Sequence, residues 1–187
     1  MQRLPAEISS QVLRPACDVF LNHRGIDTKR TVVRLLYHHL KKLRVKPFLD
    51  CINMKPGDKL FDHINKSILE CKVGVAVFSP HYCESYFCLH ELALLIESKK
   101  KLIPIFYDVK PSQLKVKDDG SLSAKELWRF SLALEEAKYT VGITYNSSNG
   151  DWSELVQSAS DVIIKCLRGH KMRSIRGNSN TTMSKPP

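Results

Sequence analysis

The apolar segment VGVAVF at residues 73–78 constrains the fold more than any other part of the chain. The segment is continuous and rich in β-branched residues, and Ser79-Pro80 ends it, so it predicts a β-strand. Both faces of this strand are apolar, and each must therefore be covered by other elements. Such two-sided burial is typical of a central strand in a parallel sheet that lies between two layers of helices.

Strand and helix patterns alternate on both sides of this segment. Further strands are expected at 17–21, 45–49, 102–107 and, as a weaker pattern, 141–144, and helices over about 28–43, 60–68, 85–96, 123–137 and 152–167. Repeated strand–helix units predict a doubly wound α/β sheet whose ligand sites lie beyond the carboxyl ends of the strands. Pro104 favours an edge position for its strand, because proline cannot donate to a neighbouring strand.

The 187 residues are 43% hydrophobic, which fits one globular domain with a substantial core. No apolar run approaches the ~20 residues that cross a bilayer, and the N-terminus lacks the apolar region of a signal peptide. Six cysteines without a CxxC pair favour a reducing compartment. We therefore expect a cytoplasmic protein without a membrane span, with the nucleus as a second location.

Four potential metal ligands, His81, Cys83, Cys88 and His90, lie close together in the sequence. Cys88 and His90 would be two residues apart on a helix, where side chains do not share a face. Packed or exposed thiols are the better interpretation, and we expect no metal.

The net charge of +10 is concentrated towards the C-terminus. From Lys165 onward the chain has six Lys or Arg residues and no Asp or Glu. Together with Ser, Asn and Pro, this composition predicts a solvated, disordered tail over residues 170–187. Contact with nucleic acid or anionic lipid is a second interpretation. It lacks the support of interleaved aromatic residues or of a nucleic-acid-binding motif.

The common nucleotide-binding and hydrolase motifs are absent. The chain has no GxGxxG after its first strand and no GxxxxGK[ST], so a dehydrogenase or a P-loop enzyme is not indicated. It also has no nucleophile elbow. Because a doubly wound sheet binds ligands beyond the carboxyl ends of its strands, near the topological switch point, we expect the site in the loops that follow the first three strands.

Four segments, in this order, resemble motifs of plant TIR (Toll/interleukin receptor) domains. CDVFLNHRGIDT (17–28) is similar to their first strand and its loop, and FLDCINMKPGDKL (48–60) to their second strand and BB loop. SPHYCESYFCLHEL (79–92) and LIPIFYDVKPSQL (102–114) resemble two later motifs. The resemblance implies a flavodoxin-like, five-stranded parallel sheet with helices on both faces, and it places the Pro104 strand inside that sheet.

The resemblance also implies a division of the chain. We expect a TIR domain over 15–169, an N-terminal extension over 1–14 and the basic tail over 170–187. No nucleotide-binding ATPase or leucine-rich-repeat segment follows in the sequence, so we expect either a TIR-only protein or a fragment, and the character of the C-terminus favours the former.

Glu91 falls at the position of the glutamate with which enzymatic members of this family cleave NAD. Breaking the nicotinamide–ribose bond develops positive charge on the ribose, in an oxocarbenium-like transition state. A fixed carboxylate stabilises that charge while nicotinamide leaves as a neutral heterocycle. The resemblance therefore implies that Glu91 is catalytic, whereas the pattern alone fits a solvated helix glutamate equally well.

Eight further residues are implied to bind the substrate. An arginine can hold a diphosphate bidentately, a glycine permits close approach of the backbone, and an aromatic ring can stack on a base. One serine can also cap its helix, and the cysteine is more simply a packed thiol. These residues are Arg24, Gly25, Asp50, Lys55, Gly57, Ser85, Phe87 and Cys88.

The chain departs from the family pattern at several positions. Asn22 and His23 stand where the family has Ser and Phe, and Phe87 stands where it has Trp. The BB-loop arginine is replaced in Pro56-Gly57, so Lys55 or a neighbouring lysine would have to supply the charge. The Ser-His pair through which plant TIR domains pack together falls at Arg34-Leu35, which puts that symmetric contact in doubt.

The resemblance implies an NAD or NADP nucleosidase that forms ADP-ribose or a cyclic isomer in immune or cell-death signalling. NAD is then the substrate, and no cofactor is expected. Homo-oligomers through TIR–TIR contacts would complete the site, and other TIR proteins are further expected partners. The alternative is a non-enzymatic adaptor that binds other TIR domains.

Overall fold

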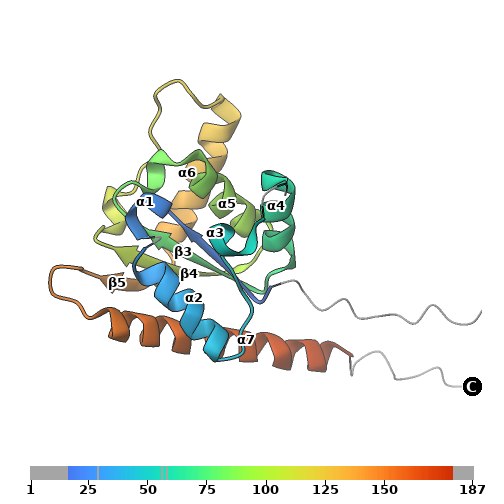
Figure 1. The fold of residues 1–187 in the computed structure, drawn as a ribbon. Coiled ribbons are helices and arrows are strands. Elements are labelled where there is room, and N and C mark those ends of the chain that lie inside the picture. Colours follow the sequence, from blue (N-terminus) through green and yellow to red (C-terminus); the bar gives the residue numbers. More distant parts are fainter. Residues whose placement is uncertain (1–16, 29, 56, 58, 179–187) are drawn as a thin grey trace, which may run out of the picture.

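The computed structural model describes residues 17–28, 30–55, 57 and 59–178, with side chains up to residue 170. Its centre is a five-stranded parallel sheet with the strand order β2-β1-β3-β4-β5 (Figure 1). The strands are β1 (Val19–His23), β2 (Pro47–Phe48), β3 (Val73–Phe78), β4 (Lys101–Tyr107) and β5 (Ile143–Tyr145). This is the flavodoxin-like order, so the predicted fold class is confirmed.

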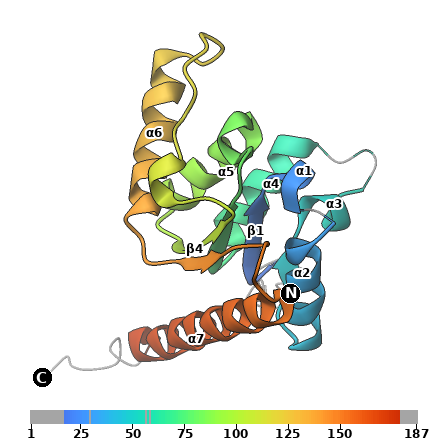
Figure 2. The same cartoon turned by 90° about the vertical axis from the view of Figure 1, so that its left-hand side faces the viewer.

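Helices cover both faces of the sheet (Figures 1 and 2). α2 and α7 pack together on one face, and α4, α5 and α6 form a layer on the other. The α-helices are α1 (Gly25–Thr28), α2 (Val32–Lys42), α3 (Asp50–Asn53), α4 (Leu60–Glu70), α5 (Tyr86–Glu97), α6 (Ala124–Lys138) and α7 (Trp152–Asn178). Short 3₁₀ helices occur at Tyr82–Glu84 and Pro111–Gln113.

The two faces of β3 belong to two separate hydrophobic cores. Val73, Val75 and Val77 pack with residues of α2 and α7, whereas Ala76 and Phe78 pack with residues of α4, α5 and α6. All six residues of the strand are buried. The two-sided burial predicted from VGVAVF is therefore confirmed, because side chains alternate between the faces of a strand.

The strand that contains Pro104 is internal, with β3 on one side and β5 on the other. The edge position suggested by this proline is thus wrong, and the position implied by the family resemblance is confirmed. β5 pairs only with residues 105–107. A Cβ atom at Gly142 would lie 2.5 Å from the Pro104 carbonyl oxygen, so the polar groups of Pro104 face the stretch just before β5 begins. The missing N–H therefore breaks no ladder hydrogen bond.

Several elements differ from the predictions. β1 continues to His23 instead of ending at residue 21, and α1 and α3 are short helices in segments expected to be loops. α7 continues to Asn178 rather than ending at residue 167. Residues 170–178 are therefore helical instead of disordered, because the chain has no proline there and Gly169 keeps a helical backbone. Residues 1–14 and 179–187 lie outside the described residues.

All six cysteines are free thiols. Within the described part of the chain, no helix is both long and apolar enough to cross a membrane. The same residues contain no group of three or more His, Cys, Asp or Glu side chains that could hold a metal ion.

Gly74 lets α5 approach the central strand. A Cβ atom at this position would lie 2.7 Å from a methyl carbon of buried Leu95. We expect Gly74→Ala to lower the free energy of unfolding by about 1–3 kcal/mol, because the packed core must shift to admit the methyl group. Urea denaturation measures this change. Gly169→Ala is the control, since its Cβ would meet nothing within 4 Å and alanine favours a helix.

A double-mutant cycle at Gly74 and Leu95 distinguishes a clash between these two residues from a general loss of strand stability. Leu95→Ala alone should cost about 2–5 kcal/mol. Because it also removes the clash, the double variant should cost less than the sum of the single changes. Strict additivity would contradict the proposed contact.

Candidate functional site

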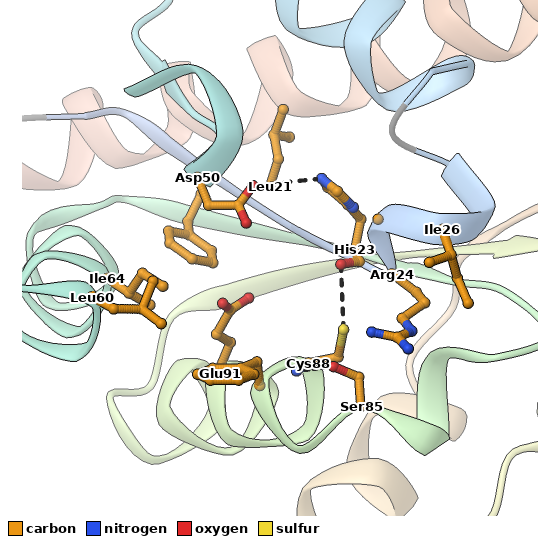
Figure 3. A pocket seen from close by; sticks show the side chains of 13 residues that line it. Leu21, His23, Arg24, Ile26, Asp50, Leu60, Ile64, Ser85, Cys88 and Glu91 are labelled. Atoms are coloured by element: carbon orange, nitrogen blue, oxygen red, sulfur yellow. Dashed lines mark hydrogen bonds and ion pairs between the residues drawn. The ribbon is translucent and has the colours of Figure 1, made fainter. Parts of the chain in front are cut away.

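A cavity of about 410 Å³ opens beyond the carboxyl ends of β1 and β2 and is bounded by α4 and α5 (Figure 3). This is the side of the sheet where a doubly wound fold binds ligands, near the point at which the strand order reverses. Its volume falls within the range of about 300–1,000 Å³ that is typical of ligand pockets. The lining residues are Phe20, Leu21, His23, Arg24, Gly25, Ile26, Asp50, Leu60, Ile64, Ser85, Phe87, Cys88 and Glu91.

Helix α5 supplies the wall that carries Glu91. Ser85 is its N-cap, and the Ser85 hydroxyl accepts a hydrogen bond of 3.3 Å from the Cys88 backbone N–H. The predicted capping role of Ser85 is thereby confirmed. Since Ser85 and Glu91 are six residues apart, the cap sets where the helix begins and so where the carboxylate lies along it.

Glu91 is buried, with only 8% of its surface exposed. Burial raises the pKa of Glu91 to about 8; a hydrogen bond from Asn22 opposes this shift, and the negative charge of Asp50 adds to it. At neutral pH the carboxyl group of the free protein is therefore largely protonated. A ligand with positive charge near this group would favour the ionised form.

A buried hydrogen-bond network holds one oxygen of Glu91. The Asn22 amide donates to Glu91 Oε2 over 2.7 Å and to the Cys88 carbonyl oxygen over 3.2 Å. The Tyr82 hydroxyl donates to Asn22 Oδ1, which orients the amide so that its N–H groups face α5. Asn22 and Tyr82 both have no exposed surface. Because Asn22 occupies Oε2, the other carboxyl oxygen of Glu91 remains available to a ligand.

Arg24 comes from the loop that follows β1, and its side chain extends towards the first turn of α5 (Figure 3). Its Nε is buried and has no hydrogen-bond partner among the described residues. An unsatisfied, buried guanidinium donor is costly in the free protein and would gain from an anionic ligand.

The loop that carries Arg24 and Gly25 is tied to the loop after β3. Asp27 accepts hydrogen bonds from the Ser79 hydroxyl at 2.6 Å and from the His81 backbone at 3.0 Å, and it contacts His81 Nδ1 at 2.7 Å. Burial alone would raise the pKa of the Asp27 carboxyl, but these contacts lower it, so the group is ionised. The Asp27 contacts therefore fix the position of the loop beside the cavity.

Cys88 is a packed thiol. It is buried, and its Sγ donates a hydrogen bond of 3.3 Å to the His23 carbonyl oxygen (Figure 3). Burial raises the pKa of this thiol to about 12, so it is protonated and a poor nucleophile. His23 Nε2 lies 3.9 Å from a carboxylate oxygen of Asp50 on the opposite wall.

Phe87 forms part of the outer rim of the cavity and is 42% exposed. Its ring stacks on Phe61 of α4, with centroids 5.3 Å apart and an interplanar angle of 26°. Tyr86 meets the Phe87 ring edge-on at 6.1 Å. The Phe87 ring is thus held in place by Phe61 and Tyr86 and is still accessible, so a planar ring of a ligand could stack on it.

The structure brings seven of the nine predicted site residues to this cavity. Lys55 and Gly57 are the exceptions, because both are exposed and neither lines the cavity. α3 takes the chain away from the strand ends before these two residues, and the chain returns to the cavity at Leu60. In the described structure the BB loop thus contributes Asp50 alone among its predicted residues.

Asn22 and Tyr82 are site residues that the sequence analysis did not identify. Asn22 was noted only as a departure from the family pattern, and it was assigned to a loop. One signal was available: Asn22 continues the alternation after Phe20, so extending the strand by two residues places it on the face of α5. Tyr82 carried no comparable signal, because its contacts depend on how the 3₁₀ helix packs.

The TIR-domain family profile matches residues 16–140 of this chain. The chain is 49% identical over 172 residues to the probable 2′ cyclic ADP-D-ribose synthase BdTIR of Brachypodium distachyon. This match covers 90% of the chain and 76% of the relative.

Two longer proteins extend this similarity. The chain is 33% identical to the TMV resistance protein N of Nicotiana glutinosa, but that match covers 76% of the chain and only 14% of the relative. Among solved structures, the TIR domains of the activated Roq1 resistosome, which recognises the effector XopQ, superpose with a TM-score of 0.71 at 30% identity. That match covers 79% of this chain and 99% of the other.

The raised pKa of Glu91 predicts a pH-dependent stability effect of Glu91→Gln. In the unfolded chain the carboxyl group loses its proton near its ordinary pKa of 4.5, whereas the folded protein keeps the proton up to about pH 8. The stability of the wild type therefore falls as pH rises through this window. Glutamine does not titrate, so we expect Glu91→Gln to be more stable by roughly 2–4 kcal/mol at pH 8 and to show little gain near pH 4.5.

Chemical denaturation across this pH range measures the difference. Glu97→Gln is the matched control on the same helix, because Arg129 lowers the pKa of the Glu97 carboxyl. Its effect should have the opposite sign and be small, since the pair is partly exposed. A gain for Glu91→Gln that does not change with pH would rule out a raised pKa as its cause.

Proposed function

The chain belongs to the TIR-domain family, and on that premise we propose that it is an NAD nucleosidase that breaks the nicotinamide–ribose bond. One observation carries the proposal: the cavity contains a buried glutamate, Glu91, whose carboxyl group is held on one oxygen and available on the other. The 49% identical relative from Brachypodium distachyon is itself described as a probable 2′ cyclic ADP-D-ribose synthase, which supports the proposal.

In the proposed step, the bond between ribose C1′ and the ring nitrogen breaks, and its electron pair returns to nicotinamide. The positive charge passes from the nicotinamide ring to the ribose. The Glu91 carboxylate is buried in the cavity wall, where its stabilisation of this charge is stronger than it would be in bulk water. Attack by water then gives ADP-ribose and a proton, and attack by a hydroxyl of the same molecule gives a cyclic isomer. The step needs no cofactor or metal.

Arg24 and the first turn of α5 are the proposed site of the diphosphate. The Arg24 Nε donor is buried without a partner among the described residues, and the positive end of the α5 dipole lies beside it at Ser85. A diphosphate placed there would accept a hydrogen bond from Arg24 Nε, and its negative charge would interact favourably with the positive end of the helix dipole. Gly25 lines the same part of the cavity, and because it has no side chain, its backbone could approach the diphosphate closely.

Phe87 is the proposed platform for a planar ring of the dinucleotide. Its support by Phe61 and its exposure at the rim suit stacking on a base. Asp50 adds negative charge to the cavity wall and so favours the cationic nicotinamide end of the substrate. We assign Cys88 a packing role, since its thiol is protonated and already donates to a backbone carbonyl.

Self-association is part of the proposal. The 30% identical TIR domains with known structure belong to an assembled resistosome. The expected role of Lys55 and Gly57 then lies between copies, because both are exposed and outside the cavity of their own chain. The proposed setting is immune or cell-death signalling in the cytoplasm, a compartment that suits six free thiols.

Glu91→Ala should reduce NAD cleavage by at least about 100-fold, because the charge-stabilising group is lost. The assay follows NAD and its products by chromatography and mass spectrometry, with protein at high concentration or clustered on beads. Glu97→Gln, on the same helix but outside the cavity, should retain activity.

Folding must be verified in each variant by circular dichroism. Cleavage that persists in folded Glu91→Ala would overturn the assignment of Glu91. If the clustered wild type consumes neither NAD nor NADP, the nucleosidase proposal fails, and the adaptor function becomes the better explanation.

Asn22 should control the pH dependence of the reaction. The ionised form of Glu91 is the active one in this proposal. We therefore expect kcat/KM to rise with pH to a plateau, with the midpoint of the rise near the Glu91 pKa of about 8. The Asn22 hydrogen bond stabilises that ionised form. We therefore expect Asn22→Ala to move the midpoint to higher pH by roughly one pH unit.

The pH profile distinguishes this role from simple misfolding, which would lower the rate at every pH. Asn65→Ala is the matched control, since Asn65 bonds to His90 on the adjacent stretch of α5 and does not contact Glu91. Its midpoint should equal that of the wild type. An unchanged midpoint in Asn22→Ala would show that the hydrogen bond does not act on the reacting carboxylate.

A further inference from the structure

The edge of the sheet opposite the cavity is strongly basic. In a parallel sheet the amino ends of all strands lie at one edge, and helices that return from the other edge end there. We call this region the amino edge and define it by eight exposed cations. They are Lys41 and Lys42 in the last turn of α2, Arg44 after that helix, Lys46 before β2, Lys99 before β4, Lys101 at the start of β4, and Lys165 and Arg168 on α7.

Backbone contacts show that these segments are neighbours. The Asp18 N–H donates to the Lys46 carbonyl oxygen over 2.7 Å, and the Lys72 N–H donates to the Asp18 carbonyl oxygen over 3.0 Å. Lys101 pairs with Val73 at the start of the adjacent strand. Arg44 and Arg168 line a common cleft with Lys72. The eight cations therefore form one surface that spans four strands, with α7 alongside.

Acidic groups near this surface already have partners. Asp18 pairs with Lys72 at 2.7 Å, Glu70 with Lys66 at 3.9 Å, and Glu97 with Arg129 at 2.6 Å. None of the eight cations of the amino edge forms an ion pair with another residue that the structure describes. Their charge is therefore not neutralised within this part of the protein.

Apolar side chains are exposed among these cations. Leu43, between Lys42 and Arg44, is 42% exposed, and Leu69, whose carbonyl oxygen accepts a hydrogen bond from Lys100, is 55% exposed. The cleft between α2 and α7 has a volume of about 900 Å³. Both apolar and basic side chains line this cleft. The apolar ones are Leu43, Val45, Ile164 and Leu167, and the basic ones are Arg44, Lys72, Arg168 and His170. Asp18 is the single acidic residue among the lining residues.

We propose that the amino edge is a docking surface for an anionic phospholipid bilayer. Lysine and arginine side chains would lie at the anionic headgroups, and Leu43 and Leu69 would reach the apolar boundary below them. The cavity that contains Glu91 lies at the opposite ends of the strands, about 20 Å away along the six residues of β3. A protein docked in this way would keep its cavity open to solution. The proposal is independent of the chemistry assigned to that cavity.

The composition of the surface favours a bilayer over nucleic acid. Proteins that bind single strands usually stack bases on aromatic rings, and no Phe, Tyr or Trp is among the residues that line the cleft or carry the eight cations. Readout of a duplex requires a helix or ribbon in a groove, whereas these cations lie at the ends of several elements along one edge. The exposed leucines have a place in a bilayer and none on a phosphate backbone.

The test is sedimentation of the full chain with vesicles of phosphatidylcholine, with and without about one third phosphatidylserine. We expect binding to the anionic vesicles only, and a loss of that binding as salt rises from about 0.05 to 0.5 M. Each basic side chain near an anionic surface contributes roughly a fivefold factor. The triple variant Lys42→Gln/Arg44→Gln/Lys101→Gln should therefore bind at least about tenfold more weakly.

The control is Lys110→Gln/Lys115→Gln/Lys125→Gln, which removes the same charge from exposed positions after β4 and at the start of α6. Its binding should change by less than about threefold, because those positions face away from the bilayer. Equal losses in both triple variants would overturn the proposal, since net charge alone would then explain binding. So would equal binding to neutral vesicles, an absence of binding, or displacement of the protein from vesicles by a short DNA duplex bound through the amino edge.

Discussion

The contact between α5 and the central strands is the interaction on which both the core and the candidate site depend. Near one end of the contact, Gly74 has no side chain, so Leu95 can pack directly against β3. Near the other end, Asn22 and Tyr82 both donate hydrogen bonds to the Cys88 carbonyl oxygen in the first turn of the same helix. Asn22 also donates to one carboxyl oxygen of Glu91. Because the helix is fixed at both ends, the carboxyl group is placed with little freedom, which is the preorganisation that charge stabilisation requires.

Burial of this carboxyl group is costly for the folded protein and useful for the proposed chemistry. A carboxylate removed from water without a cation partner is disfavoured, and the raised pKa of Glu91 expresses that cost. The Asn22 amide recovers part of it. A positively charged substrate would supply the missing counter-charge, so the interaction would strengthen when the nicotinamide–ribose end of NAD enters the cavity and again as charge moves to the ribose.

Much of the fold could be predicted because its cause is local. The apolar run at 73–78 requires cover on both faces, and Ser85 can begin a helix wherever its hydroxyl meets the third N–H. The strand that contains Pro104 was harder to place. Its internal position depends on where β5 begins, which is a property of the neighbouring strand rather than of the proline itself. The continuation of α7 to Asn178 was missed because composition alone suggested a tail, although no residue there stops a helix.

The sequence by itself determined the alternation of strands and helices and the two-sided burial of the centre, and its resemblance to TIR domains directed attention to Glu91. Only the tertiary structure decided which side chains control that residue. Asn22 and Glu91 are 69 positions apart, and a hydrogen bond between them exists only because β1 and α5 pack together. It also separated Lys55 and Gly57 from the cavity and gathered cations from α2, from the starts of β2 and β4 and from α7 at one edge. Spacing along a chain predicts local elements, whereas contacts between distant elements depend on how their faces pack.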